Sequence, residues 1–156
     1  MADLHQFIEE RGISVRELSR LTNVHSNTLN KYLSANSNSC TNGRLRVFWK
    51  IANGLEVDVE TLLCGDNWHP TEDIIRSPIS IHDAISRKAV WLNTSTMDIR
   101  NQIRSLLHLD NYSTLSAYEN YRWVPTIADA LSISQYLNCT IDALWGKYFK
   151  ELENAG

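Results

Sequence analysis

Two short helical patterns, separated by a brief break, occupy residues 14–33 and constrain the fold more than any other feature of the sequence. Ser14 is followed three positions later by Glu17, which is the spacing of a capping box at the start of a helix. The apolar side chains of this helix are expected to be Leu18 and Leu21. Asn23 is expected to end it, because asparagine tolerates the left-handed backbone of a tight turn. A further helix is predicted from about Ser26, and its inward-facing side chains are expected to be Leu29, Tyr32 and Leu33.

Helical spacing continues along the rest of the chain, and no run of alternating apolar and polar residues is typical of a strand. An earlier helix is expected to end at Gly12, with an apolar face formed by Leu4, Phe7 and Ile8. After a polar loop at residues 34–43, one helix is predicted from Arg44 to Gly54 and a short one after Asp58, its N-cap. Further helices are predicted over residues 81–92, 97–108, 112–120, 126–137 and 141–151. The predicted fold class is all-α.

Two small domains are expected. Residues 65–78 hold two prolines and several acids and amides, a composition typical of a linker. The predicted domains are therefore residues 1–65 and 79–156, joined by a linker at residues 66–78. The segment LRVFWKIANGLEVDVETLLCG of the first lines up with IADALSISQYLNCTIDALWG of the second. The second domain is accordingly expected to be a divergent copy of the first.

Residues 19–31 meet the requirements of a helix-turn-helix that reads DNA. Such a motif needs a small residue at the helix crossing, a turn residue that accepts a positive φ, and polar side chains opening the second helix. Ser19 and Asn23 are the candidates for the first two, with Val24 as a buried residue of the turn. The side chains predicted to face base edges are Ser26, Asn27, Thr28 and Asn30. Those predicted to contact phosphates or to flank this surface are Arg16, Arg20, His25, Lys31, Arg44 and Arg46.

The stretch SVRELSRLTNVHSNTLNKYLS, followed by LRVFWKIANGLEVDVETLL, resembles the lambda-repressor-like helix-turn-helix family, also called the Cro-type or xenobiotic-response-element family. The resemblance covers about residues 4–65. It implies a five-helix domain that binds the major groove, usually as a dimer on a palindromic operator. Two such domains in tandem are expected here. The chain departs from the family at Val15, where members often carry glutamine, at His25, where serine is frequent, and in a longer loop at residues 34–43.

The predicted motif lies in a basic segment of an acidic chain. The whole chain has a net charge of -3, whereas residues 11–50 contain seven basic residues and one acid, a local charge of +6. Affinity for phosphates depends on the local potential and not on the charge of the whole chain. The charge map therefore favours double-stranded DNA as the partner of the first domain.

The second domain is less suited to reading bases. Arg104 falls where Ser19 lies in the first, and a long charged side chain there would have to shift the helix crossing. Its turn is one residue longer, and residues 99–124 carry three arginines against two acids. Dimerisation or partner binding is therefore expected of this domain. Subsidiary DNA contacts are left open for Arg100, Arg104 or Arg122. A homodimer would place two reading helices one DNA turn apart, about 34 Å.

Other chemistries have no supporting pattern. The five histidines form no HxxxH or HExxH pair, and the three cysteines, Cys40, Cys64 and Cys139, are widely spaced. No phosphate-binding glycine loop or nucleophile motif occurs, so no enzyme, catalytic residue, metal, cofactor or small-molecule substrate is predicted. The five tryptophans are expected to pack in cores or at an interdomain or dimer surface, with Trp68 and Trp123 as alternative partner anchors.

The predicted function is that of a sequence-specific DNA-binding transcriptional regulator, a repressor of phage, plasmid or mobile-element type. The alternative is a protein-interaction adaptor, antitoxin-like or anti-repressor, that reuses the fold. No apolar run approaches the roughly 18 residues of a membrane span, and no secretory signal is expected at MADLHQFIEERG. The expected location is the cytoplasm, in association with a bacterial nucleoid.

Overall fold

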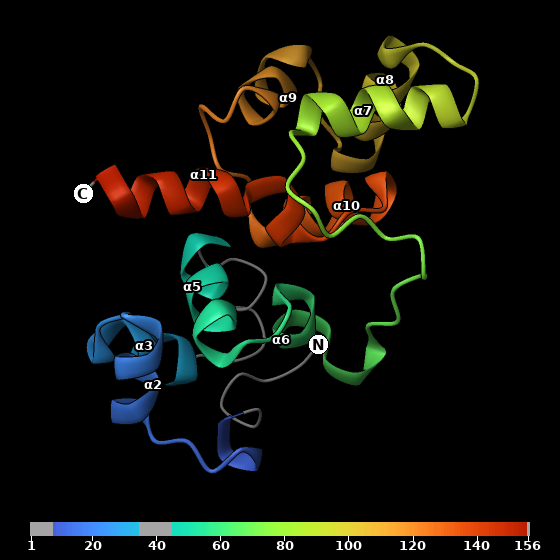
Figure 1. The fold of residues 1–156 in the computed structure, drawn as a ribbon. Helices are drawn as coiled ribbons and strands as arrows, with labels where there is room; N and C mark the ends of the chain where they lie inside the picture. The colour runs from blue at the N-terminus through green and yellow to red at the C-terminus, as the bar shows by residue number, and fades with distance from the viewer. Residues whose placement is uncertain (1–7, 35–44, 156) are drawn as a thin grey trace. The chain divides into compact units, whose positions relative to one another are not determined.

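The computed structural model describes residues 8–34 and 45–155, and in these ranges it is built from helices and their connections (Figure 1). No strand occurs in these ranges, where a single isolated parallel bridge joins Ile75 to Cys139. The predicted all-α class is therefore confirmed for the part of the chain that is described. Contacts divide the chain into two compact units. Unit 1 is Met1–Thr71 with Thr126–Ala128, and unit 2 is Glu72–Pro125 with Asp129–Gly156.

Unit 1 consists of short helices around an aliphatic and aromatic core. After helical residues 8–10 the chain turns at Gly12, where φ is +65°. The elements that follow are α2 (Val15–Thr22), α3 (Ser26–Ser34), α5 (Leu45–Leu55), α6 (Val59–Cys64) and the 3-10 helix η1 (Gly65–Asn67). α5 packs chiefly against α2. The fully buried side chains include Leu18, Leu29, Phe48, Ile51, Leu62 and Leu63.

Several predictions for unit 1 fall on residues that lie outside the described part of the chain. These are the core positions Leu4 and Phe7, the loop after Ser34, Arg44, and the side chains of Tyr32 and Leu33.

The buried side of α2 differs from the prediction. Leu18 is buried as predicted, but Leu21 is 41% exposed. Thr22 is buried instead, because its hydroxyl donates to the carbonyl oxygen of Leu18 at 2.7 Å and so satisfies its polar atom inside the helix. A buried threonine at this position leaves Leu21 at the edge of the core.

Gly54 is the penultimate residue of α5, so the predicted end of this helix is displaced by one residue. The helix continues to Leu55, and the chain reverses at Glu56, whose φ is +57°. A Cβ atom on Gly54 would lie 2.6 Å from Cγ2 of Thr22 and 2.8 Å from the carbonyl oxygen of Leu21. Glycine is required here because α5 approaches the end of α2 too closely for a side chain.

Unit 2 contains five helices, of which the first four follow the predicted ranges within one residue at each end, whereas the last continues four residues beyond its predicted end at residue 151. They are α7 (Ile81–Trp91), α8 (Thr96–Leu107), α9 (Tyr112–Glu119), α10 (Ile127–Leu137) and α11 (Ile141–Ala155). Ser80 and Ser95 act as N-caps, accepting hydrogen bonds from the backbone N–H groups of Asp83 and Asp98. The buried side chains include Ile81, Ile85, Ile99, Ile103, Trp145 and Phe149.

The hydroxyl of Tyr121 ties two helices of unit 2 together. It accepts a hydrogen bond from the N–H of Ile81 at 3.1 Å and donates one to the carbonyl oxygen of Leu144 at 2.6 Å. The first residue of α7 is thereby connected to the first half of α11. Both backbone groups are part-buried, so the hydroxyl replaces water that they would otherwise need.

The second half of the predicted linker is bonded to unit 2. The N–H of Ile75 donates to the carbonyl oxygen of Asn138 at 2.9 Å, and the N–H of Thr140 donates to that of Ile75 at 2.9 Å. Farther along, the N–H of Ile79 donates to the carbonyl oxygen of Ala143 at 3.0 Å. Residues 75–79 therefore run as an extended segment along the turn between α10 and α11.

Non-glycine residues with a left-handed backbone follow the C-terminal ends of six helices, each within two residues of the end. They are Asn23, Glu56, Asn93, His108, Tyr121 and Asn138. The predicted role of Asn23 at the end of its helix is confirmed.

The tryptophans divide into buried and exposed groups. Trp49 and Trp145 are buried as predicted, whereas Trp91 and Trp123 are 78% and 59% exposed. Trp91 is therefore not a core residue, and the predicted alternative of an interdomain or dimer surface stays a prediction for it. No helix in the described ranges is long and apolar enough to cross a membrane.

Candidate nucleic-acid interface

The interface begins with the cap of α2. Ser14 has an extended backbone, and its Oγ accepts a hydrogen bond from the N–H of Glu17 at 3.1 Å. This contact is the first half of the predicted capping box, and it fixes where α2 starts. Val15, the first residue of the helix, is half-buried.

The turn between α2 and α3 is held by two hydrogen bonds. Asn23 has φ 57° and ψ 32°, and its N–H donates to the carbonyl oxygen of Ser19 at 3.0 Å. The hydroxyl of Ser19 donates to the carbonyl oxygen of Val24 at 2.7 Å, and Val24 is buried. The predictions for Asn23 and Val24 are thus confirmed. Ser19 also has a role beyond its small size, because its hydroxyl joins α2 to the turn.

His25 caps α3. Its Nδ1 accepts a hydrogen bond from the N–H of Asn27 at 3.1 Å, and its carbonyl oxygen accepts one from the N–H of Leu29 at 3.1 Å. A ring nitrogen that accepts a hydrogen bond carries no proton, so the neutral imidazole holds its proton on Nε2. The sequence predicted His25 only as a flanking residue. Its position immediately before Ser26, where helices prefer a side-chain acceptor, was the available signal for this role.

The polar residues of α3 are not equally accessible. Leu29 is fully buried against the core, which sets the orientation of the helix. Asn27 and Asn30 are exposed and lie three positions apart, so they share one face. Ser26 and Thr28 are half-buried at the edges of that face. The structure therefore brings all four predicted base-facing residues into the first five positions of α3, with the two asparagines most accessible.

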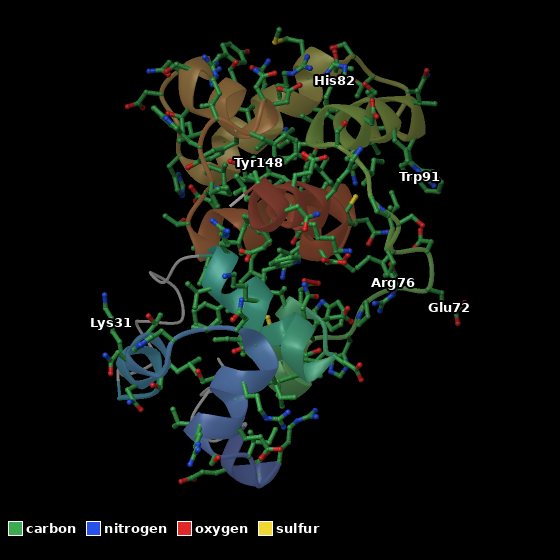
Figure 2. All side chains as sticks on the ribbon, turned by 60° about the vertical axis from the view of Figure 1, so that its left-hand side comes forward. Lys31, Glu72, Arg76, His82, Trp91 and Tyr148 are labelled. Atoms are coloured by element: carbon green, nitrogen blue, oxygen red, sulfur yellow. The ribbon has the colours of Figure 1, made fainter. Side chains whose placement is uncertain are left out.

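The predicted flanking basic residues that the structure describes lie on three helices of unit 1. Arg16 and Arg20 are exposed and lie four positions apart on α2, so they occupy one side of it. Lys31 is exposed, and Figure 2 shows its side chain on the outer side of α3. Arg46 is half-buried near the start of α5. The side chains of lysine and arginine are long enough to contact a phosphate from an exposed helix position.

The two helices, the left-handed turn and the polar opening of the second helix together define a helix-turn-helix. Residues 3–64 match the family model described as the Cro/C1-type HTH DNA-binding domain. This match supports a helix-turn-helix DNA-binding protein, as predicted. No curated protein and no solved structure matches the chain. The matched residues all lie in unit 1, so the divergent second copy and the xenobiotic-response-element name stay predictions.

The α8–α9 pair of unit 2 repeats some of the local geometry. His108 ends α8 with φ 56° and ψ 41°, close to the values of Asn23 in unit 1. Four residues separate α8 from α9 and three separate α2 from α3, as the sequence predicted. Nη2 of Arg104 donates to the carbonyl oxygen of Asp110 at 2.8 Å, and its guanidinium lies 4.0 Å from the ring centroid of Tyr112. Arg104 thus contacts the backbone of the turn, as Ser19 does in unit 1.

Arg100 is also engaged inside unit 2. It donates to both carboxylate oxygens of Glu119, at 2.6 and 3.1 Å, and His82 contacts the same carboxylate at 3.1 Å. Burial alone would raise the pKa of Glu119, but the hydrogen bonds from Arg100 and His82 outweigh burial and lower that pKa. One carboxylate therefore links α7, α8 and α9. Of the three arginines considered for subsidiary DNA contact, Arg100 and Arg104 make contacts within the unit.

Proposed function

We propose that the protein is a transcriptional regulator that places α3 in the major groove of double-stranded DNA. The observation that carries this proposal is the exposed Asn27–Asn30 face of a helix whose start is fixed by the turn and by His25. Asparagine can bond the N6 and N7 positions of adenine in a bidentate manner, and the threonine methyl of Thr28 can contact a thymine methyl. Arg16, Arg20 and Lys31 would hold the backbone phosphates.

The proposed action is repression, without enzymatic activity, in the cytoplasm of a bacterium or of a phage-infected cell. Support comes from the local charge of +6 around the motif and from the family match over residues 3–64. A repressor is expected to lower expression from a promoter that overlaps its selected site, whereas an activator would raise it.

The groove assignment is tested with the full chain on a site selected from genomic fragments. Asn27→Ala and Thr28→Ala are expected to cost about 1–3 kcal/mol of binding free energy and to relax the preference at one base position. Arg20→Ala is expected to weaken all sequences alike and to reduce the salt dependence of binding. Unchanged binding and base preference in both the Asn27 and Thr28 variants would refute the groove assignment.

We further propose that the protein acts as a homodimer assembled through unit 2. A dimer would supply the pair of reading helices that a palindromic operator needs. Large apolar side chains are exposed at the end of α7 and the start of α8, including Val90, Leu92 and Met97. Exposed apolar groups of this kind favour contact with a second copy. Sedimentation of the full chain should show a dimer that Leu92→Glu with Met97→Glu dissociates, while Leu106→Glu, at the far end of α8, leaves it intact.

The adaptor remains the second candidate. The observation in its favour is that Val15 is a half-buried apolar residue and offers no hydrogen bond at the start of α2. The salt titration separates the two candidates. A groove binder loses affinity steeply as salt rises, whereas an adaptor binds no DNA at any salt concentration.

A further inference from the structure

A cavity of about 580 Å³ lies within unit 2, between α7, the end of α10 and the extended segment at Ile75. One face of α7 forms a wall, because the residues three, four and seven positions after Ala84 all contribute to it: Arg87, Lys88 and Trp91. Ile75 and the buried Leu137 belong to the opposite side. Cavities of about 300–1,000 Å³ with mostly apolar walls are typical of small-molecule sites.

The charged groups of the cavity give it a positive balance. Arg87 is exposed, and Lys88 is half-buried with its Nζ 4.9 Å from the ring centroid of Tyr136. The aromatic ring restrains this ammonium group at the wall of the cavity. Asp73 is the single acid in the lining, and its carboxylate accepts a hydrogen bond from Nδ2 of Asn138 at 3.3 Å. Two cations against one carboxylate favour an anionic occupant.

The apolar part of the lining defines the rest of the occupant. Trp91 is 78% exposed at the end of α7, where Figure 2 labels it, and it belongs to the same lining as Arg87 and Lys88. Ala84 and Leu137 are buried and form apolar surface. A phosphate of a nucleic-acid backbone would use only the two cations, whereas this lining also offers an apolar interior.

We propose that this cavity binds a small amphipathic anion. Its flat apolar body would lie against Ile75, Leu137 and the indole of Trp91, and its acidic group would contact Arg87 and Lys88. The site lies wholly within unit 2 and does not depend on DNA binding by unit 1.

Two fluorescent probes test the site on the full chain. Anilinonaphthalene sulfonate has a flat apolar body and one acidic group, and phenylnaphthylamine has the same rings without the sulfonate. One equivalent of the sulfonate probe is expected to bind, about tenfold more tightly than the neutral probe, because a hydrogen bond to a charged group contributes roughly this much.

Arg87→Gln with Lys88→Gln is expected to abolish the difference between the probes while leaving the neutral probe bound. The matched control, Arg122→Gln with Lys147→Gln, removes two exposed cations of unit 2 from outside the cavity lining and should leave both affinities unchanged. Trp91→Ala should weaken the binding of both probes. Because the Trp91 side chain is exposed, the substitution should not unfold unit 2. Absence of binding, equal affinity of the two probes for the unsubstituted chain, or equal effects of the two double variants would overturn the proposal.

Discussion

The backbone N–H of Asn27 donates to Nδ1 of His25 at 3.1 Å, so the side chain that precedes α3 also caps it. The cap holds the first turn of the helix, where all the predicted base-facing residues but Asn30 lie. It also leaves Nε2–H of the neutral imidazole as a donor on an exposed side chain.

His25→Ala is expected to lower the free energy of unfolding by about 1 kcal/mol, because the N–H of Asn27 loses its acceptor. His25→Asn should retain most of this stability, since asparagine is a good N-cap residue. Urea unfolding followed by circular dichroism measures both changes. His69→Ala, at an exposed histidine outside the helices, is the control. Equal losses in the alanine and asparagine variants at position 25 would show that capping is not its role.

Gly54→Ala is expected to destabilise unit 1 by about 1–3 kcal/mol, because the added Cβ meets the carbonyl oxygen of Leu21, which cannot rotate away. The neighbouring Asn53 is exposed on the same helix, so Asn53→Ala should change stability by no more than about 0.5 kcal/mol. Thermal unfolding of the two variants makes the comparison. The close approach is contradicted if the two substitutions have the same effect.

Tyr121→Phe is expected to cost about 1–3 kcal/mol, because the carbonyl oxygen of Leu144 and the N–H of Ile81 both lose their partner. Tyr148→Phe is a suitable control, since the Tyr148 ring packs 5.4 Å from that of Tyr121 and the substitution keeps the ring. Guanidinium unfolding of both variants should show the larger shift for Tyr121. An equal or larger shift for Tyr148 would mean that the two hydrogen bonds of the Tyr121 hydroxyl do not carry the effect.

The stability of unit 2 is expected to depend on pH through Glu119. Its pKa is lowered in the folded chain, so its contribution is complete above the ordinary pKa of a glutamate. The contribution is lost as the pH falls through the lower folded pKa. The unfolding free energy of the unsubstituted chain should therefore approach that of Glu119→Gln as the pH falls below the ordinary pKa of a glutamate and through the lower folded pKa. The exposed Glu151→Gln should follow the unsubstituted chain throughout. A constant difference between the unsubstituted chain and Glu119→Gln would exclude this linkage.

The helix bounds of unit 2 were predictable because local groups decide them. Ser80 and Ser95 supply caps directly before α7 and α8, and the apolar spacing inside each helix is regular. The same reasoning succeeded for Asn23, whose amide side chain suits the left-handed turn. In each case the interacting groups lie within a few residues of one another, so sequence proximity was sufficient.

The predictions that were wrong depend on contacts between distant residues. Gly54 could not be assigned a packing role, because the atoms that exclude its Cβ belong to Leu21 and Thr22. The pairing of Ile75 with the turn before α11 could not be predicted either, because its bridge partner, Cys139, lies far away in the sequence. Trp91 was predicted to lie either in a core or at an interdomain or dimer surface, and its exposure at the end of α7 excludes the core. For the interface, the identity of the residues was predictable, but the ranking of Asn27 and Asn30 above Ser26 and Thr28 in exposure required the structure.

Substitution by glycine at left-handed positions that follow the helix ends would raise the thermal stability of the protein. A residue with a Cβ costs about 1 kcal/mol more than glycine in this conformation. The cost is smallest for asparagine. Glu56 is the clearest case, because it is exposed and lies outside the helix-turn-helix. Selection for growth at higher temperature would therefore be expected to find glycine at this position before it altered the surface of α3.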